Sequence, residues 1–170
     1  MSLVIREATA ADIPAVVPLH LKTWRATYEG LLSEKELNGP TYEIRERQWR
    51  KAFEVADGNR FHFVVEDETG QLVGFAVGRP SDHPEFEGEL NKIYLPREYQ
   101  RQGLGRRLVG HIVRRFLSRG VTSMWVYADG RTASCKFYEA LGGEKLDADP
   151  TTGNYGWRDL QRLAAICTEE

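Results

Sequence analysis

The sequence is poor in cysteine and has no long apolar run. Cys135 and Cys167 are the two cysteines among 170 residues, and their spacing forms neither a disulfide framework nor a metal-ligand pattern. No apolar run approaches the roughly 20 residues that cross a bilayer, and no charged start followed by an apolar block suggests a secretory signal. We therefore expect a cytoplasmic protein without a metal ion or a membrane partner.

The chain also lacks a large net charge, which is −2. This balance gives no general reason to expect a nucleic-acid partner. The positive charge is nevertheless concentrated, since residues 97–119 contain seven arginines and one acid, Glu98. Nucleic-acid binding by that segment would weaken steeply with salt, and we expect a small anionic ligand there instead. The length favours a single domain over residues 1–170, with a core large enough to fold without disulfides.

Hydrophobic periodicity alternates along the chain between the periods of strands and helices. Period-two segments predict strands at 3–6, 60–66, 72–77, 89–95, 123–128, 144–146 and 155–160. Segments with the helical period predict four helices, at 13–28, 43–55, 104–117 and 132–141. This order indicates an α/β fold, with a mixed, mostly antiparallel sheet of six to seven strands flanked by four helices.

A glycine turn precedes the helix predicted at 104–117. Its sequence is Gln100-Arg101-Gln102-Gly103-Leu104-Gly105-Arg106. Free N–H groups and the helix dipole attract anions to a helix N-terminus, and glycine lets the main chain come close to them. The turn is neither a P-loop nor a dinucleotide fingerprint, because both need other spacings. A Gly-x-Gly pair alone usually marks only a turn, but the surrounding arginines favour a phosphate site.

Two stretches resemble motifs of the GNAT acyl-CoA N-acyltransferase superfamily. Residues 90–108 are similar to its central motif, and residues 133–143 to its later motif. The resemblance is strong over 61–143 and looser elsewhere, while residues 20–30 resemble the first helix of a bacterial subgroup that includes polyamine acetyltransferases. The resemblance implies an enzyme that transfers an acetyl group from acetyl-CoA to a primary amine by direct attack.

The resemblance also implies where acetyl-CoA, as co-substrate, would bind. The main chain of Ile93, Tyr94 and Leu95 would pair with the pantetheine arm, and a free N–H there would polarise the thioester carbonyl. Family members often carry asparagine where this chain has Arg131, so Arg131 or Ser134 is expected to meet the cofactor instead. The pyrophosphate would lie on Arg101, Gln102, Gly103, Leu104, Gly105 and Arg106.

Tyr138 and Glu89 are the implied catalytic residues. The thiolate of the leaving coenzyme A has an ordinary pKa of about 8.5 and a tyrosine about 10, so Tyr138 can act as general acid. The alternative for Tyr138 is a core aromatic. Glu89 would accept the amine proton directly or through water, and its alternative is a solvated glutamate at a strand end. Tyr127, where some relatives have glutamate, is a lesser candidate.

The acceptor would lie beside the first helix, where Trp24 and Tyr28 are four residues apart. Tyr28 is the better candidate for the pocket, and core packing is the alternative for Trp24. A loop with Asp82, Glu85 and Glu87 favours a polyamine or other small cationic amine, although acidic loops are often merely solvated. The open alternatives are a peptide acceptor, as in a protein N-terminal acetyltransferase, and a non-catalytic acyl-CoA-binding regulatory module. Related enzymes are often dimers, so a homodimer is among the expected assemblies.

Overall fold

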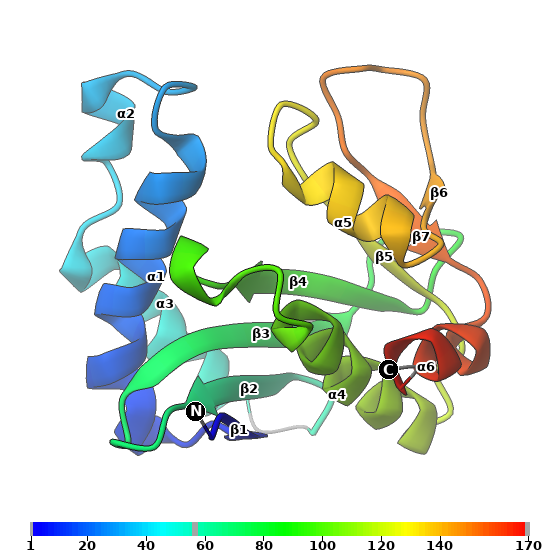
Figure 1. The fold of residues 1–170 in the computed structure, drawn as a ribbon, viewed down its shortest axis with the longest axis horizontal. Coiled ribbons are helices and arrows are strands. Elements are labelled where there is room, and N and C mark those ends of the chain that lie inside the picture. The colour runs from blue at the N-terminus through cyan, green and yellow to red at the C-terminus, as the bar shows by residue number, and fades with distance from the viewer. Residues whose placement is uncertain (1, 56–57, 169–170) are drawn as a thin grey trace.

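The computed structural model describes residues 2–55 and 58–168. They form one seven-stranded sheet and the helices that pack against it (Figure 1). The strand order is β1-β2-β3-β4-β5-β7-β6. Neighbouring strands are antiparallel except β4 and β5, which are parallel, so the predicted mixed and mostly antiparallel sheet is confirmed. The strands are β1 (Val4–Glu7), β2 (Phe61–Glu66), β3 (Leu72–Pro80), β4 (Gly88–Tyr94), β5 (Met124–Val126), β6 (Glu144–Lys145) and β7 (Tyr155–Trp157).

Six α-helices occur in the described part of the chain, so the prediction of four helices is wrong in number. They are α1 (Ile13–Tyr28), α2 (Glu34–Leu37), α3 (Tyr42–Glu54), α4 (Leu104–Ser118), α5 (Ser134–Ala140) and α6 (Leu160–Thr168), with short 3-10 turns η1 (Ala10–Asp12) and η2 (Arg97–Tyr99). In the residues that the structure describes, no helix combines the length and the apolar character that crossing a membrane requires.

The two additional helices are α2 and α6. The single turn of α2 is too short to give a periodic signal, and it is held by a capping box in which Ser33 and Glu36 exchange hydrogen bonds. The strand predicted at 155–160 ends at Trp157, and α6 begins at Leu160. Its buried stripe begins at Leu160 and packs against α4, where Gly110 leaves room for the close approach of Cys167.

The core has one half on each face of the sheet. Side chains alternate between the faces along a strand, so Val64 and Phe75 pack beneath α1 and α3, whereas Phe63 and Ala76 pack beneath α4. Figure 1 shows α1 and α3 on the opposite side of the sheet from α4 and α6. A residue of a central strand can therefore face either of two separately packed helical layers.

The central strands β4 and β5 pair over only three residues each. Gly88–Leu90 lies against Met124–Val126. Beyond Leu90, β4 remains paired with β3 as far as Tyr94, but its ladder with β5 has ended. The register with β3 shifts at Val77/Gly78, which leaves Asn91 as an extra residue in a β-bulge. The two parallel strands therefore separate toward their carboxyl ends.

The packing of α6 predicts a measurable loss of stability. Leu160→Ala removes a side chain that is fully buried at the start of α6, and we expect it to lower the free energy of unfolding by about 2–4 kcal/mol. Gln161→Ala changes the exposed neighbouring residue of the same helix and should change that free energy by less than about 0.5 kcal/mol. Urea unfolding followed by circular dichroism measures both variants, and equal stability of the two would contradict the packing described.

Candidate functional site

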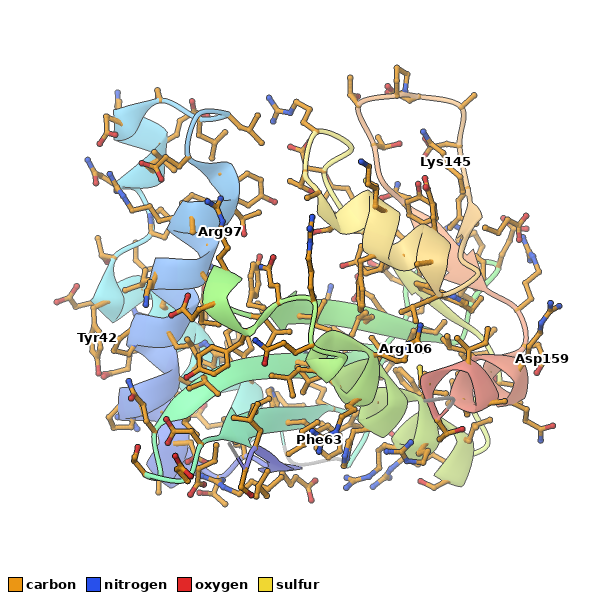
Figure 2. The ribbon with its side chains drawn as sticks, viewed as in Figure 1. Tyr42, Phe63, Arg97, Arg106, Lys145 and Asp159 are labelled. Carbon is orange, nitrogen blue, oxygen red and sulfur yellow. The ribbon has the colours of Figure 1, made fainter. Side chains whose placement is uncertain are left out.

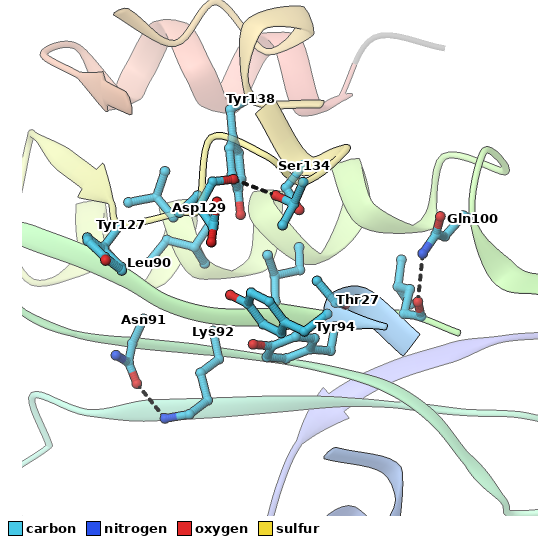
Figure 3. A pocket seen from close by; sticks show the side chains of 16 residues that line it. Thr27, Leu90, Asn91, Lys92, Tyr94, Gln100, Tyr127, Asp129, Ser134 and Tyr138 are labelled. Atoms are coloured by element: carbon cyan, nitrogen blue, oxygen red, sulfur yellow. Dashed lines mark hydrogen bonds between the residues drawn. The ribbon is translucent and has the colours of Figure 1, made fainter. Parts of the chain in front are cut away.

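A cleft of about 120 Å³ opens where β4 and β5 separate (Figure 3). It lies between α1 and α5, and its floor is the carboxyl half of β4. Its wall consists of Thr27 and Tyr28, residues 90–95, Gln100, residues 126–129, Thr132, Ser134 and Tyr138. The structure thus brings together the strand, the tyrosine of the later motif and the first helix, which are far apart in the sequence.

Tyr138 projects from α5 toward this cleft (Figure 3). Its side chain is only 4% exposed and its ring packs against the rings of Tyr155 and Trp157. Tyr138 is therefore both a core aromatic and a cleft residue. Burial, followed by the neighbouring Tyr94, raises the pKa of Tyr138 well above the ordinary value of 10. The hydroxyl carries its proton at neutral pH, as a tyrosine of ordinary pKa also does.

The glycine turn follows η2 and runs into the first residues of α4, and Figure 2 labels Arg97 before it and Arg106 at its end. Gly103 is the N-cap of α4 with φ 77°, in the left-handed region, and a Cβ built there would meet no heavy atom within 4 Å. Within the described chain, the backbone N–H groups of Leu104 and Gly105 have no acceptor. The start of α4 is thus an open, N–H-lined surface suited to an anion.

The two glycines of the turn have different roles. Whereas Gly103 is open to solvent, a Cβ at Gly105 would lie 3.1 Å from the ring of Phe137, so Gly105 allows α4 and α5 to pack closely. Leu104 is buried in the core, so only its main chain faces the turn. The side chain of Gln100 donates a hydrogen bond to the Leu95 carbonyl over 2.9 Å and ties the turn to the end of β4.

Ile93, Tyr94 and Leu95, which the family resemblance implies as cofactor-binding residues, line the cleft. On their β5 side the ladder has ended. Apart from the Leu95 carbonyl, which Gln100 binds, this side of their main chain therefore presents an unpaired strand edge, to which an extended molecule with amide groups can add by main-chain hydrogen bonds.

Glu89 lies one residue before the cleft-lining part of β4. Its side chain is 6% exposed, and its carboxylate forms an ion pair with Nε of Arg79 on β3. Glu89 is not among the described residues that line the cleft. It is therefore a buried, partnered carboxylate rather than a solvated strand-end residue.

Lys92 and Asn91 are cleft residues that the sequence reasoning missed. The Lys92 ammonium donates to Oδ1 of Asn91 over 2.8 Å, and Figure 3 shows its side chain running away from Tyr138. Burial, with added repulsion from Arg79 and Arg45, lowers the pKa of Lys92 to about 8. Lys92 is a lone lysine inside an apolar strand segment, so the sequence could have indicated it as a candidate site residue. The β-bulge at Asn91 does not change the hydrophobic pattern, so the sequence could not have indicated Asn91.

On α1, Tyr28 lines the cleft and Trp24 does not. Burial raises the pKa of Tyr28. Trp24 packs its ring against Tyr28 at a centroid distance of 5.2 Å and beneath the guanidinium of Arg45, at 5.6 Å. It thus supports Tyr28 from behind. Tyr127 also lines the cleft but is 68% exposed.

The loop after β5 contributes Asp129 to the cleft, and the first residue of α5 contributes Ser134. The Asp129 carboxylate is bound by Arg131 over 2.7 Å, and this contact lowers the pKa of Asp129. Arg131 itself is outside the set of described residues that line the cleft. Of the two expected substitutes for the family's asparagine, Ser134 is therefore the one at the cleft. Residues 2–55 and 58–168 contain no group of three His, Cys, Asp or Glu side chains placed to hold a metal ion.

Comparisons with known proteins agree with this geometry. The model of the acetyltransferase (GNAT) family matches residues 24–143. The chain is 33% identical over 172 aligned residues to the uncharacterized N-acetyltransferase YuaI of Bacillus subtilis, covering 95% of this chain and 96% of the relative. It is 31% identical over 107 residues to the ribosomal protein bS18 alanine N-acetyltransferase of Escherichia coli K12, covering 59% and 70%.

A similar fold occurs in the crystal structure of the PaiA N-acetyltransferase from Thermoplasma acidophilum in complex with coenzyme A. The TM-score is 0.80 at 19% identity, over 92% of this chain and 98% of that chain. Because the sequence identity is low, this similarity is evidence for the fold alone. It confirms the predicted α/β architecture.

The ion pair of Arg79 with the buried Glu89 carboxylate predicts a stability effect that exposed pairs do not share. Arg79→Ala leaves the Glu89 carboxylate buried without its ion pair, and we expect the free energy of unfolding to fall by about 2 kcal/mol. Arg25→Ala, which breaks the exposed pair with Glu34, should cost less than about 1 kcal/mol. Chemical denaturation measures both, and an equally small effect of the two variants would show that the buried pair is not a structural contact.

Proposed function

The chain belongs to the acetyltransferase (GNAT) family and is an N-acetyltransferase, and from that premise we propose that it transfers the acetyl group of acetyl-CoA to a primary amine by direct attack. One observation carries the proposal: the cleft joins a free edge of β4 and the protonated Tyr138, and Gln100, the first residue of the turn before α4, also lines it. The coenzyme A complex of the similar PaiA fold supports the choice of co-substrate.

Acetyl-CoA would follow β4 from the turn into the cleft. We propose that the turn from Arg101 to Arg106 binds the pyrophosphate, because Gly103 leaves its surface open and the helix start offers N–H groups. The pantetheine amides would pair with the main chain of Ile93 to Leu95, and Ser134 would contact the arm from α5. The thioester would then lie between β4 and Tyr138.

The chemistry requires two proton transfers. The amine nitrogen attacks the thioester carbonyl carbon, a C–N bond forms, and the C–S bond breaks. A main-chain N–H of β4 stabilises the oxyanion, and the Tyr138 hydroxyl gives its proton to the departing sulfur. Because Glu89 is set back from the cleft wall, we propose that it accepts the amine proton through water. Positioning of the two reactants supplies much of the acceleration.

The acidic loop gives little structural support to the hypothesis of a polyamine acceptor. Glu85 contacts Arg158 over 3.4 Å, and Glu87 accepts a 2.9 Å hydrogen bond from the Thr122 hydroxyl. Neither these acids nor Asp82 are among the described residues lining the cleft. The bS18 alanine N-acetyltransferase is named for a protein acceptor, so a peptide amine remains the second candidate. Homodimer formation and a cytoplasmic location also remain predictions.

The role of Tyr138 predicts a selective loss of turnover. Tyr138→Phe keeps the ring packing but removes the proton donor, so kcat should fall by about 100-fold while the KM for acetyl-CoA changes by less than about threefold. Tyr127→Phe, at the exposed edge of the same cleft, should keep kcat within about twofold. Thiol release measured with both variants tests this, and an unchanged kcat in Tyr138→Phe would remove Tyr138 from the mechanism.

The proposed role of Gly103 predicts that Gly103→Ala weakens coenzyme A binding. Gly120→Ala is the control for the effect of such a substitution on stability. Gly103 and Gly120 both have φ 77° and open space at Cβ, so alanine at either position should destabilise the fold by about 1 kcal/mol. Only Gly103→Ala should weaken coenzyme A binding, by about tenfold, because only Gly103 faces the proposed pyrophosphate. Calorimetric titration measures both affinities, and equal affinities of the two variants would place the pyrophosphate elsewhere.

A further inference from the structure

A second cavity of about 340 Å³ lies on the other side of β4 from Tyr138, between the sheet and α3. Its volume is within the range of small-molecule sites. Asn91 and Lys92 line both this cavity and the catalytic cleft. The β-bulge at Asn91 therefore lies between the two spaces.

The described lining of the second cavity is rich in positive charge. Five cationic side chains line it, and no Asp or Glu is among its described lining residues. The cations are Arg45, Lys51, Arg60, Arg79 and Lys92. Of these, Arg79 is paired with Glu89. We name this space the basic cavity.

Arg45 is the most informative of these cations. It projects from α3, and its Nε is buried without a hydrogen-bond partner in the described part of the molecule. One of its terminal nitrogens donates to Gln48 over 3.1 Å, and Trp24 lies against its guanidinium. A buried guanidinium nitrogen without an acceptor is costly, and Arg45 itself lines the cavity, where an anionic ligand would pair with its charge.

Two histidines also line the basic cavity but add no charge near neutral pH. Trp49 donates to Nδ1 of His20 over 3.1 Å, and burial lowers the pKa of His20 to about 3 and that of His62 to about 4. The field in the cavity therefore comes from the arginines and lysines. Arg79, Arg45 and Arg60 all repel the Lys92 ammonium, and Glu89 offsets them only in part.

We propose that the basic cavity binds a carboxylate or phosphoryl group of the acceptor, so that the acceptor is a small anionic amine. The amino group would pass the bulge at Asn91 and enter the cleft, while Arg45 and Lys92 hold the anionic end. The inference rests on the proposed function and names the substrate class of the same site. A polyamine, which has only cationic groups, would be repelled by this lining.

Matched pairs of amines test the anionic end directly. Phosphoethanolamine is compared with ethanolamine, and β-alanine with β-alaninamide, in a thiol-release assay at constant ionic strength, with spermidine as the polyamine probe. The anionic member of at least one pair should have a kcat/KM at least tenfold above that of its neutral partner and above that of spermidine. The pair that responds distinguishes a phosphoryl from a carboxylate site. Equal rates within both pairs, or the highest rate with spermidine, would overturn the proposal.

Variants of α3 then test whether the basic cavity is the part of the protein that recognises the anionic group. Arg45→Gln should reduce the preference for the anionic amine about tenfold through its KM, whereas Arg47→Gln, on the exposed face of the same helix, should leave the preference unchanged. If Arg45→Gln does not fold, Arg60→Gln at the exposed rim of the cavity should lower the preference in the same direction. An anionic preference that survives in the folded cavity variants would overturn the assignment to this cavity.

A binding measurement separates this proposal from the proposed function. If no amine in the panel is acetylated, phosphoethanolamine and β-alanine are titrated into the protein saturated with coenzyme A, which must itself bind if the proposed function holds. Binding of either anionic amine, weakened about tenfold by Arg45→Gln, supports the basic cavity. Coenzyme A binding without binding of either amine overturns the cavity alone, and loss of coenzyme A binding overturns the proposed function.

Discussion

The short pairing between β4 and β5 is the constraint on which the site depends. Two parallel strands that are joined over three residues and then separate leave one strand edge without main-chain partners in the interior of a sheet. Such an edge is costly if nothing covers it, because backbone groups away from water need partners. A co-substrate with amide groups can complete this edge, so the same geometry that opens the cleft also defines the kind of molecule that fills it.

The bulge at Asn91 extends this constraint to the other face of the sheet. After the bulge, Ile93 and Leu95 pack in the same layer as Tyr138, whereas Lys92 lines the basic cavity on the side of α1 and α3. In the proposed reaction, the two helical layers would therefore contribute different chemistry. The α4 and α5 side offers an anion-binding helix start and a proton donor, and the α3 side offers a basic cavity. A group transfer between two molecules needs such separate access from two directions.

The sequence could predict the strands, the long helices and the glycine turn, because each has a local signal in hydrophobic period or glycine position. It could not predict α2, which is one turn long, or the end of β7, where apolar residues continue from a strand into α6. At the site, Tyr138 and Ile93 to Leu95 lie where the motifs suggested. Asn91, Lys92 and Arg45 were missed because a bulge, and a cavity between α3 and the sheet, arise only from tertiary packing.

Amide hydrogen exchange, followed by nuclear magnetic resonance with and without coenzyme A, tests the central claim most directly. The claim is that the free edge of β4 is completed by the co-substrate. Exchange of at least one amide among residues 93–95 should slow by about tenfold or more when coenzyme A is added, whereas that of Leu90, which lies within the β4–β5 pairing, should change little. Unchanged exchange at residues 93–95 in the presence of saturating coenzyme A would contradict the account.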